Sequence, residues 1–103
     1  MRSNVFALAL VLCVSTLLHA ESAGETVFKK NCVMCHGADG KGTTKMGLKL
    51  GAANLTSNDI QSLSDEALAQ TIRNGKGKMP PFGKSLSDDE INEVVKYVRT
   101  LRK

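Results

Sequence analysis

Cys32-Val33-Met34-Cys35-His36 is the stretch around which the rest of this sequence is organised. Cys-x-x-Cys-His is the pattern for covalent attachment of a c-type haem, in which each thiol forms a thioether and the adjacent imidazole reaches the iron. On a helical turn both sulfurs face the same side, and His36 follows Cys32 by four residues. The motif therefore predicts that Cys32 and Cys35 bind haem covalently and that His36 is the proximal iron ligand.

Three other interpretations of the motif remain open: a thioredoxin-like redox pair, half of a zinc site, and chance. A structural zinc ion needs about four ligands. The remaining Cys and His of the chain, Cys13 and His19, both precede residue 20. A thioredoxin-like pair should lie beside a βαβ pattern, and the sequence shows no strand pattern. Haem attachment is therefore the preferred interpretation.

The first 22 residues have the build of a secretory signal peptide. Arg2 provides a short positive region, an apolar stretch follows, and small or polar residues come after it. The apolar stretch is short for a membrane span of about 18–20 residues. Cleavage after Ala20 and cleavage after Ser22 both fit. We predict a cleaved leader over 1–22 and one domain over 23–103, exported to a periplasm; the alternatives are a photosynthetic lumen and an uncleaved membrane anchor.

Cleavage would leave no cysteine or histidine outside the motif, which excludes a second histidine ligand from the same chain and, if both cysteines carry haem, an internal disulfide. About 80 residues would remain, a size at which a core alone supplies only about 3–5 kcal/mol, so a buried macrocycle would supply missing apolar volume. The chain carries 14 basic and 10 acidic residues and no tryptophan. This modest basic excess without an aromatic stacking platform does not predict nucleic-acid binding.

Hydrophobic spacing predicts helices over about 24–34, 58–63 and 64–74, and a last helix that begins after Ser87. Ser87 and Glu90 make a capping box at the start of the last helix. The stretch 43–57 has no clear periodicity and is expected to be an irregular loop. Its leucines, Leu48, Leu50 and Leu55, would contact either the haem edge or the core. The fold class is all-α.

A haem iron held by one imidazole has a second axial position. Met34 lies inside the motif on the proximal side, which leaves Met46, Met79 and the lysines as candidates. Pro80 restricts Met79 to extended geometry and can fix its thioether without a helix behind it. We predict Met79 as the distal ligand. Met46, an open or water-filled site, and a role for Met79 as a core filler are the alternatives.

The mature chain resembles the small class I cytochromes c of the bacterial monohaem type. The resemblance covers essentially all of it and rests on the motif together with Gly24, Phe28, the loop Gly77-Lys78-Met79-Pro80, and Tyr97. It implies three to five helices wrapped around one covalent haem c. It also implies that the first and last helices cross near Gly24, Phe28 and Tyr97.

One departure from the family concerns the partner of the proximal imidazole. Many members have a proline soon after the motif, whose carbonyl accepts the histidine N–H bond, and none lies between His36 and Met79 here. A backbone carbonyl near Leu50 or Gly51 is the expected replacement.

His/Met ligation implies a soluble single-electron carrier between exported or membrane redox complexes, and not an enzyme, because no axial position is vacant. The alternatives are a dedicated cytochrome subunit of an exported dehydrogenase or oxidase, and a haem enzyme or gas sensor with a labile sixth ligand. We expect a monomer without a small-molecule substrate. Its partners would be redox proteins with acidic docking surfaces, steered by lysines that could equally be plain solvated residues. These are Lys45, Lys49, Lys76, Lys78 and Lys84.

Overall fold

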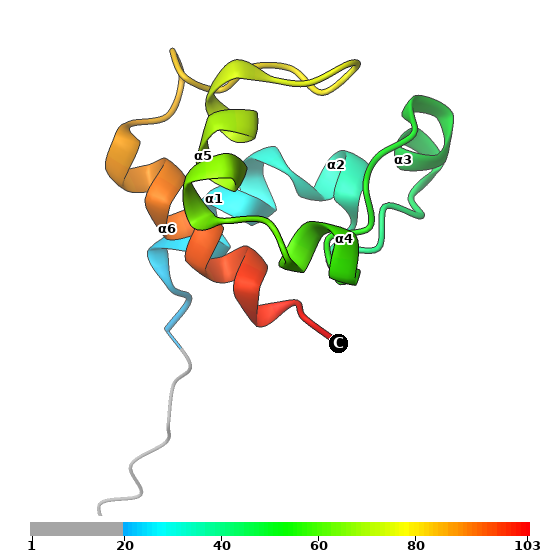
Figure 1. Cartoon of the computed structure of the whole chain (residues 1–103), viewed down its shortest axis with the longest axis horizontal. Helices are drawn as coiled ribbons and strands as arrows, with labels where there is room; N and C mark the ends of the chain where they lie inside the picture. Colours follow the sequence, from blue (N-terminus) through cyan, green and yellow to red (C-terminus); the bar gives the residue numbers. More distant parts are fainter. Residues whose placement is uncertain (1–19) are drawn as a thin grey trace, which may run out of the picture.

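The computed structural model describes residues 20–103, and within them the chain is helical with no β-sheet. Its helices are α1 (Ala23–Asn31), α2 (Val33–His36), α3 (Lys45–Leu50), α4 (Asn58–Gln61), α5 (Asp65–Asn74) and α6 (Asp88–Thr100) (Figure 1). The all-α prediction is confirmed, and most of the predicted leader lies outside the described residues. In the described part of the chain, no helix has the length and hydropathy that a membrane span requires.

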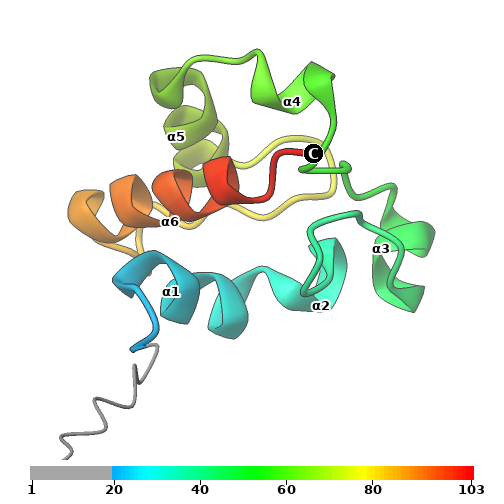
Figure 2. The ribbon, with the colours of Figure 1, turned by 90° about the horizontal axis from the view of Figure 1, so that it is seen from below.

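Helices α1 and α6 cross at close range, as the family resemblance implied (Figure 2). Phe28 and Tyr97 pack at the crossing, with ring centroids 5.0 Å apart and planes inclined by 52°. Gly24 is buried there, and a Cβ at this position would lie 2.1 Å from the carbonyl oxygen of Glu93. Glycine at position 24 therefore sets how closely the two helices approach.

The core lies among α1, α5 and α6, and its largest fully buried side chains are Phe28, Ile91 and Val94. The predicted capping box is present: the Ser87 amide donates to Glu90 Oε1 at 3.0 Å, and the Glu90 amide donates to Ser87 Oγ at 3.1 Å. Helix α5 begins after Ser64, which also accepts a capping bond, and ends before Gly75. These boundaries match the sequence prediction because each depends on local signals.

The expectation of an irregular loop over 43–57 was wrong, since this stretch contains α3. The Thr44 side chain caps α3 by accepting a hydrogen bond from the Gly47 amide at 2.9 Å, and Gly51 ends it with φ +70°. A helix of six residues is too short to show an amphipathic repeat. Of the leucines in the stretch, Leu55 packs against the core, whereas Leu48 is 70% exposed.

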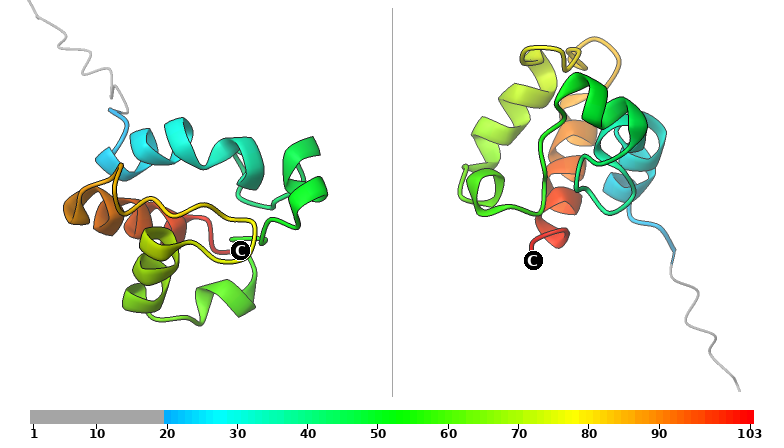
Figure 3. Two further views of the ribbon diagram at one scale, coloured as in Figure 1. Left: turned by 90° about the horizontal axis from the view of Figure 1, so that it is seen from above. Right: turned by 90° about the vertical axis from the view of Figure 1, so that its right-hand side faces the viewer.

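The helix expected over 24–34 is interrupted at Cys32, so the described chain has more helical segments than the three to five anticipated. Cys32 has φ −116° and ψ −30°, which lie outside the ideal helical range, and it connects α1 to α2. The break at Cys32 leaves Val33–His36 on the short helix α2, with Cys32 at its start. Figure 3 shows α2 and the adjoining α3 at one end of the molecule.

Gly24→Ala tests the crossing of α1 and α6. Inside an open helix this change stabilises by roughly 0.5–1 kcal/mol. Here the new methyl group would meet the backbone of Glu93, so we expect the free energy of unfolding to fall by about 1–3 kcal/mol in guanidinium denaturation. Lys30→Ala on the exposed face of α1 is the control and should change stability by less than about 0.5 kcal/mol. A gain in stability for Gly24→Ala would contradict the close approach.

Candidate functional site

The two predicted attachment cysteines and the predicted proximal histidine lie on one helical turn. The amides of Cys35 and His36 both donate to the carbonyl oxygen of Cys32, at 3.3 and 2.9 Å. Both cysteines are free thiols and half-buried, and His36 is half-buried as well. The turn thus presents two sulfurs and one imidazole together, as the spacing predicted.

The ring of His36 is fixed by one hydrogen bond. Its Nδ1 lies 3.0 Å from the carbonyl oxygen of Ala53. A carbonyl oxygen only accepts, so Nδ1 carries the proton, and in the neutral ring Nε2 keeps its lone pair. This arrangement orients a histidine for binding metal through Nε2. The carbonyl that accepts from His36 therefore belongs to Ala53, and not to Leu50 or Gly51 as expected. Leu50 is the last residue of α3 and the chain turns at Gly51, so the acceptor lies two residues further on.

Two glycines bring the backbone around His36 together. The amide of Gly42 donates to the carbonyl oxygen of His36 at 2.8 Å, and a Cβ at Gly42 would lie 2.9 Å from the carbonyl oxygen of Ala53. A Cβ at Gly47 would lie 2.1 Å from the carbonyl oxygen of Cys35. Side chains at these positions would push the segment that contains Ala53 and helix α3 away from the motif.

Thr44 is a further site residue that sequence reasoning missed. Its Oγ1 is 2.7 Å from the carbonyl oxygen of Met34 and 3.0 Å from that of Cys35, and it also accepts from the Gly47 amide. One hydroxyl therefore caps α3 and joins it to the attachment motif. The sequence signal that could have identified it is Thr44 itself, a threonine three residues before a glycine at the start of a stretch for which no helix was predicted.

Met79 lies in a tight turn between α5 and α6. Lys76 and Met79 exchange backbone hydrogen bonds of 3.1 and 3.0 Å, with Gly77 at φ +56° inside the turn. A Cβ at Gly75 would lie 2.6 Å from the carbonyl oxygen of Met79, so glycine allows the end of α5 to pass close to the turn. Met79 is half-buried, and the turn extends toward the side of the molecule that carries α2 and α3 (Figures 1 and 2).

Met46, the alternative distal ligand, lies on α3 and is 40% exposed. Helix α3 packs against α2, the helix that carries the motif. Met46 is therefore attached to the same unit as the proximal ligand, whereas Met79 comes from a separate segment.

The Cys32 thiol lacks the lowered pKa that is typical of a redox-active cysteine pair. Burial raises the pKa of Cys32 to about 11, and the charge of Cys35 adds to the increase. Thioredoxin-like cysteines instead have lowered pKa values, because the thiolate is the nucleophile. Within residues 20–103, no three His, Cys, Asp or Glu side chains converge as a zinc site would need.

The donor set fits a haem c. It offers two free thiols on one turn, an imidazole whose Nε2 is available, and a thioether on a loop stiffened by Pro80. Helices α2 and α3 bury no large apolar side chain, and backbone hydrogen bonds and close glycine contacts hold them in place. Cys32, Cys35 and His36 would hold the group from one side, and Met79 is the thioether available from another segment.

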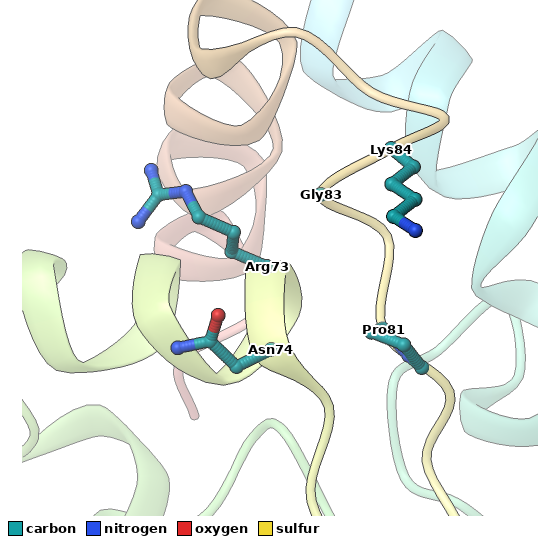
Figure 4. Close-up of a pocket in the computed structure, with 5 residues that line it drawn as sticks. All are labelled: Arg73, Asn74, Pro81, Gly83 and Lys84. Carbon is teal, nitrogen blue, oxygen red and sulfur yellow. The ribbon is translucent and has the colours of Figure 1, made fainter.

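A pocket away from these residues lies between the end of α5 and the loop that follows the Met79 turn. Figure 4 shows its lining: Arg73, Asn74, Pro81, Gly83 and Lys84. Arg73 pairs with Asp88 at 3.2 Å, and its carbonyl oxygen accepts from the Gly83 amide at 3.0 Å. None of the predicted haem-binding residues lines this pocket.

The sequence is similar to small cytochromes and to a subunit of a cytochrome oxidase. The family model described as Cytochrome C oxidase, cbb3-type, subunit III matches residues 19–98. The cbb3-type cytochrome c oxidase subunit CcoP of Azospirillum brasilense is 38% identical over 89 residues, which are 84% of this chain and 30% of that protein. Cytochrome c6 of Rippkaea orientalis is 37% identical over 90 residues, which are 87% of this chain and 78% of that protein.

A solved structure shows the same similarity in three dimensions. The c-type cytochrome KustC0563 superposes with a TM-score of 0.72 at 33% sequence identity, over 78% of this chain and 98% of that one. The chain is thus similar to small cytochromes over most of their length, and to one part of a longer oxidase subunit.

Proposed function

The chain belongs to the cytochrome c family, and from this we propose that it carries single electrons on one haem c attached through Cys32 and Cys35 and ligated by His36 and Met79. The observation that carries the proposal is the single turn that presents both thiols beside an imidazole whose Nδ1 is bonded to Ala53. That bond leaves Nε2 as the metal-binding nitrogen.

Met79 is proposed as the distal ligand for two reasons. The turn that carries it is fixed by reciprocal backbone bonds to Lys76 and by the following Pro80, so the thioether needs little reorganisation on binding. Its segment is also separate from α2, so its thioether is independent of the turn that carries His36. Met46 is on α3, which packs against the proximal motif itself.

When bound, a haem iron with imidazole and thioether ligands supplies a one-electron couple in which the thioether favours the ferrous state. His36 and Met79 would hold the iron in both redox states. His36 keeps its orientation through Ala53, and Met79 keeps its place through the turn. The protein is accordingly an electron carrier and not an enzyme.

Met79→Ala tests the distal ligand. We expect the purified ferric protein to show a methionine-to-iron charge-transfer band that is absent in Met79→Ala. The ferrous variant should bind carbon monoxide readily, because its axial position is open, whereas the wild-type protein should resist it. Absorption spectroscopy measures both. Met46→Ala is the matched control and should behave like the wild type. Loss of the band in Met46→Ala alone would assign the ligand to α3.

We also propose that a basic surface steers the protein to acidic redox partners. It consists of five exposed lysines, none of which forms an ion pair with another described residue: Lys45, Lys49, Lys76, Lys78 and Lys84. The stretches 37–57 and 75–84 contain six lysines and a single carboxylate, Asp39. Such an imbalance raises encounter rates with anions more than it raises final affinity.

Oxidation of the ferrous protein by ferricyanide, a small anionic probe, tests this surface. We expect the second-order rate constant to fall as ionic strength rises from about 0.01 M to about 0.15 M, because the screening length shortens from about 30 to about 8 Å. A Lys76→Gln/Lys78→Gln variant should react more slowly at low salt. Lys30→Gln/Lys96→Gln makes the same charge change on α1 and α6 and should have a smaller effect. If both double variants slow the reaction equally, the net charge of the protein explains the effect and the position of these lysines does not matter.

Of the two cleavage sites that fit the sequence, we propose the one after Ala20, which moves the start of the domain from residue 23 to residue 21; contacts at the start of α1 support this position. Ser22 Oγ accepts from the Glu25 amide at 3.1 Å, and the Glu21 carboxylate accepts from Lys29, whose hydrogen bond lowers the pKa of Glu21. Cleavage after Ser22 would remove both contacts. It would also place a positive α-amino group at the N-terminus of α1, where the helix dipole disfavours it.

A second candidate function is that of a fixed cytochrome subunit, which the similarity to CcoP favours. In a free carrier, protein released by osmotic shock should elute from gel filtration as a monomer. Its intact mass should correspond to a chain that begins at Glu21. Elution with a larger redox complex would support the subunit role. A mass that includes residues 1–20 would support a retained anchor.

A further inference from the structure

The Ala53 carbonyl, which accepts from His36, lies two residues before Leu55. Hydrogen bonds hold the backbone at Leu55. The Leu55 amide donates to the carbonyl oxygen of Gly40 at 2.7 Å, and its own carbonyl oxygen accepts from the side chain of Gln61 at 2.7 Å. Both backbone polar groups of Leu55 are therefore held. These bonds restrict the direction of the Ala53 carbonyl, because only the backbone torsions of Asn54 separate it from the Leu55 amide.

Gln61 is one of two buried polar residues in the described chain, with 4% of its surface exposed. Its Nε2 donates to the carbonyl oxygens of Leu55 and, at 3.0 Å, of Val98. The second acceptor is in the last turn of α6 and also accepts from the Leu101 amide at 3.0 Å, so the Gln61 side chain provides a second hydrogen bond to a carbonyl at the end of that helix. Since both acceptors are carbonyl oxygens, only the NH₂ end of the amide can face them.

Arg99 holds Gln61 from the opposite side. Its Nη1 donates to the Gln61 backbone carbonyl at 3.0 Å and lies 3.4 Å from the amide oxygen, while its Nε donates to Asp65 Oδ1 at 2.9 Å. Helix α4 is thereby tied to the C-terminal end of α6, beside which it lies in Figures 1 and 2. A connected set of hydrogen bonds runs from α6 through Gln61 to the segment of Ala53.

We propose that Gln61 is a positioning residue for His36: it holds Leu55 and thereby keeps the Ala53 carbonyl in hydrogen-bonding distance of Nδ1. The inference rests on the proposed role of His36 as an iron ligand. It adds that α4 and α6, which contain no iron ligand, help to fix the orientation of the His36 imidazole.

Loss of the Gln61 hydrogen bond should change the reduction potential of the haem in one direction. A hydrogen bond from Nδ1 to a carbonyl oxygen makes the imidazole a stronger donor through Nε2, which favours the more highly charged ferric iron. Loss of the Gln61 bond lets the Ala53 carbonyl move away from Nδ1. The ferrous state should then gain relative to the ferric state, so the reduction potential should rise.

Gln61→Met removes the amide but keeps a side chain of similar length. In a spectroelectrochemical titration of the haem-loaded protein, we expect the ratio of ferrous to ferric protein at a fixed solution potential to rise about threefold, or roughly 28 mV at 59 mV per tenfold change. In the ferrous protein, exchange of the His36 Nδ1 proton with solvent, followed by NMR, should be about threefold faster.

Val95→Ala provides the control for stability alone. Val95 is a core residue of α6 with 3% of its surface exposed and no hydrogen bond to the Leu55 segment. It should lower the free energy of unfolding and leave the reduction potential unchanged. If Gln61→Met does not fold, Arg99→Met decides the question: it leaves the amide in place without its support, and the potential should shift in the same direction.

An unchanged potential and unchanged proton exchange in a folded Gln61→Met or Arg99→Met protein would overturn the inference. An equal shift in Val95→Ala would do so as well, because a general loss of stability would then explain it. The wild-type protein separates this inference from the proposed function. If it shows His/Met ligation while the variants do not shift, only the role of Gln61 is wrong.

Discussion

The hydrogen bond from His36 Nδ1 to the carbonyl oxygen of Ala53 is the contact on which the haem-binding half of this structure depends. It fixes the tautomer of the imidazole and therefore which nitrogen can bind iron. It also spans 17 residues of chain, so it closes the segment between the attachment motif and α4. The close contacts at Gly42 and the fastening of Leu55 both serve to keep this one carbonyl in place.

The two halves of the domain are stabilised in different ways. Helices α1, α5 and α6 bury a conventional apolar core around Phe28, Ile91 and Val94. Helices α2 and α3 contain no fully buried large apolar side chain: Val33 packs in part against the core, and the hydroxyl of Thr44 and a close backbone contact at Gly47 join the two helices. Apart from the helix crossing at Gly24, we expect the core half to tolerate volume-conserving exchanges among apolar residues, whereas Gly47 and Thr44 have no close substitute in the half with the motif.

The similar region makes up most of cytochrome c6, 78% of its sequence, but only 30% of the longer CcoP. The predicted haem-binding residues are half-buried and do not by themselves distinguish the two settings. What would distinguish a free carrier from a subunit is the outer surface, above all the lysines of α3 and of the Met79 turn. A shared fold does not by itself decide between these roles.

The sequence by itself determined the elements whose signals are local. The Cys32–His36 spacing, the capping box of Ser87 and Glu90, and the end of α5 at Gly75 all involve residues within four positions of one another. Only the tertiary structure decided that Ala53 accepts from His36 and that Gln61 supports it. The reason is physical: every backbone carbonyl has the same chemistry, so its choice as a partner depends on where distant segments pack. Gln61 and Val98, which are 37 residues apart, meet only once α4 lies against α6.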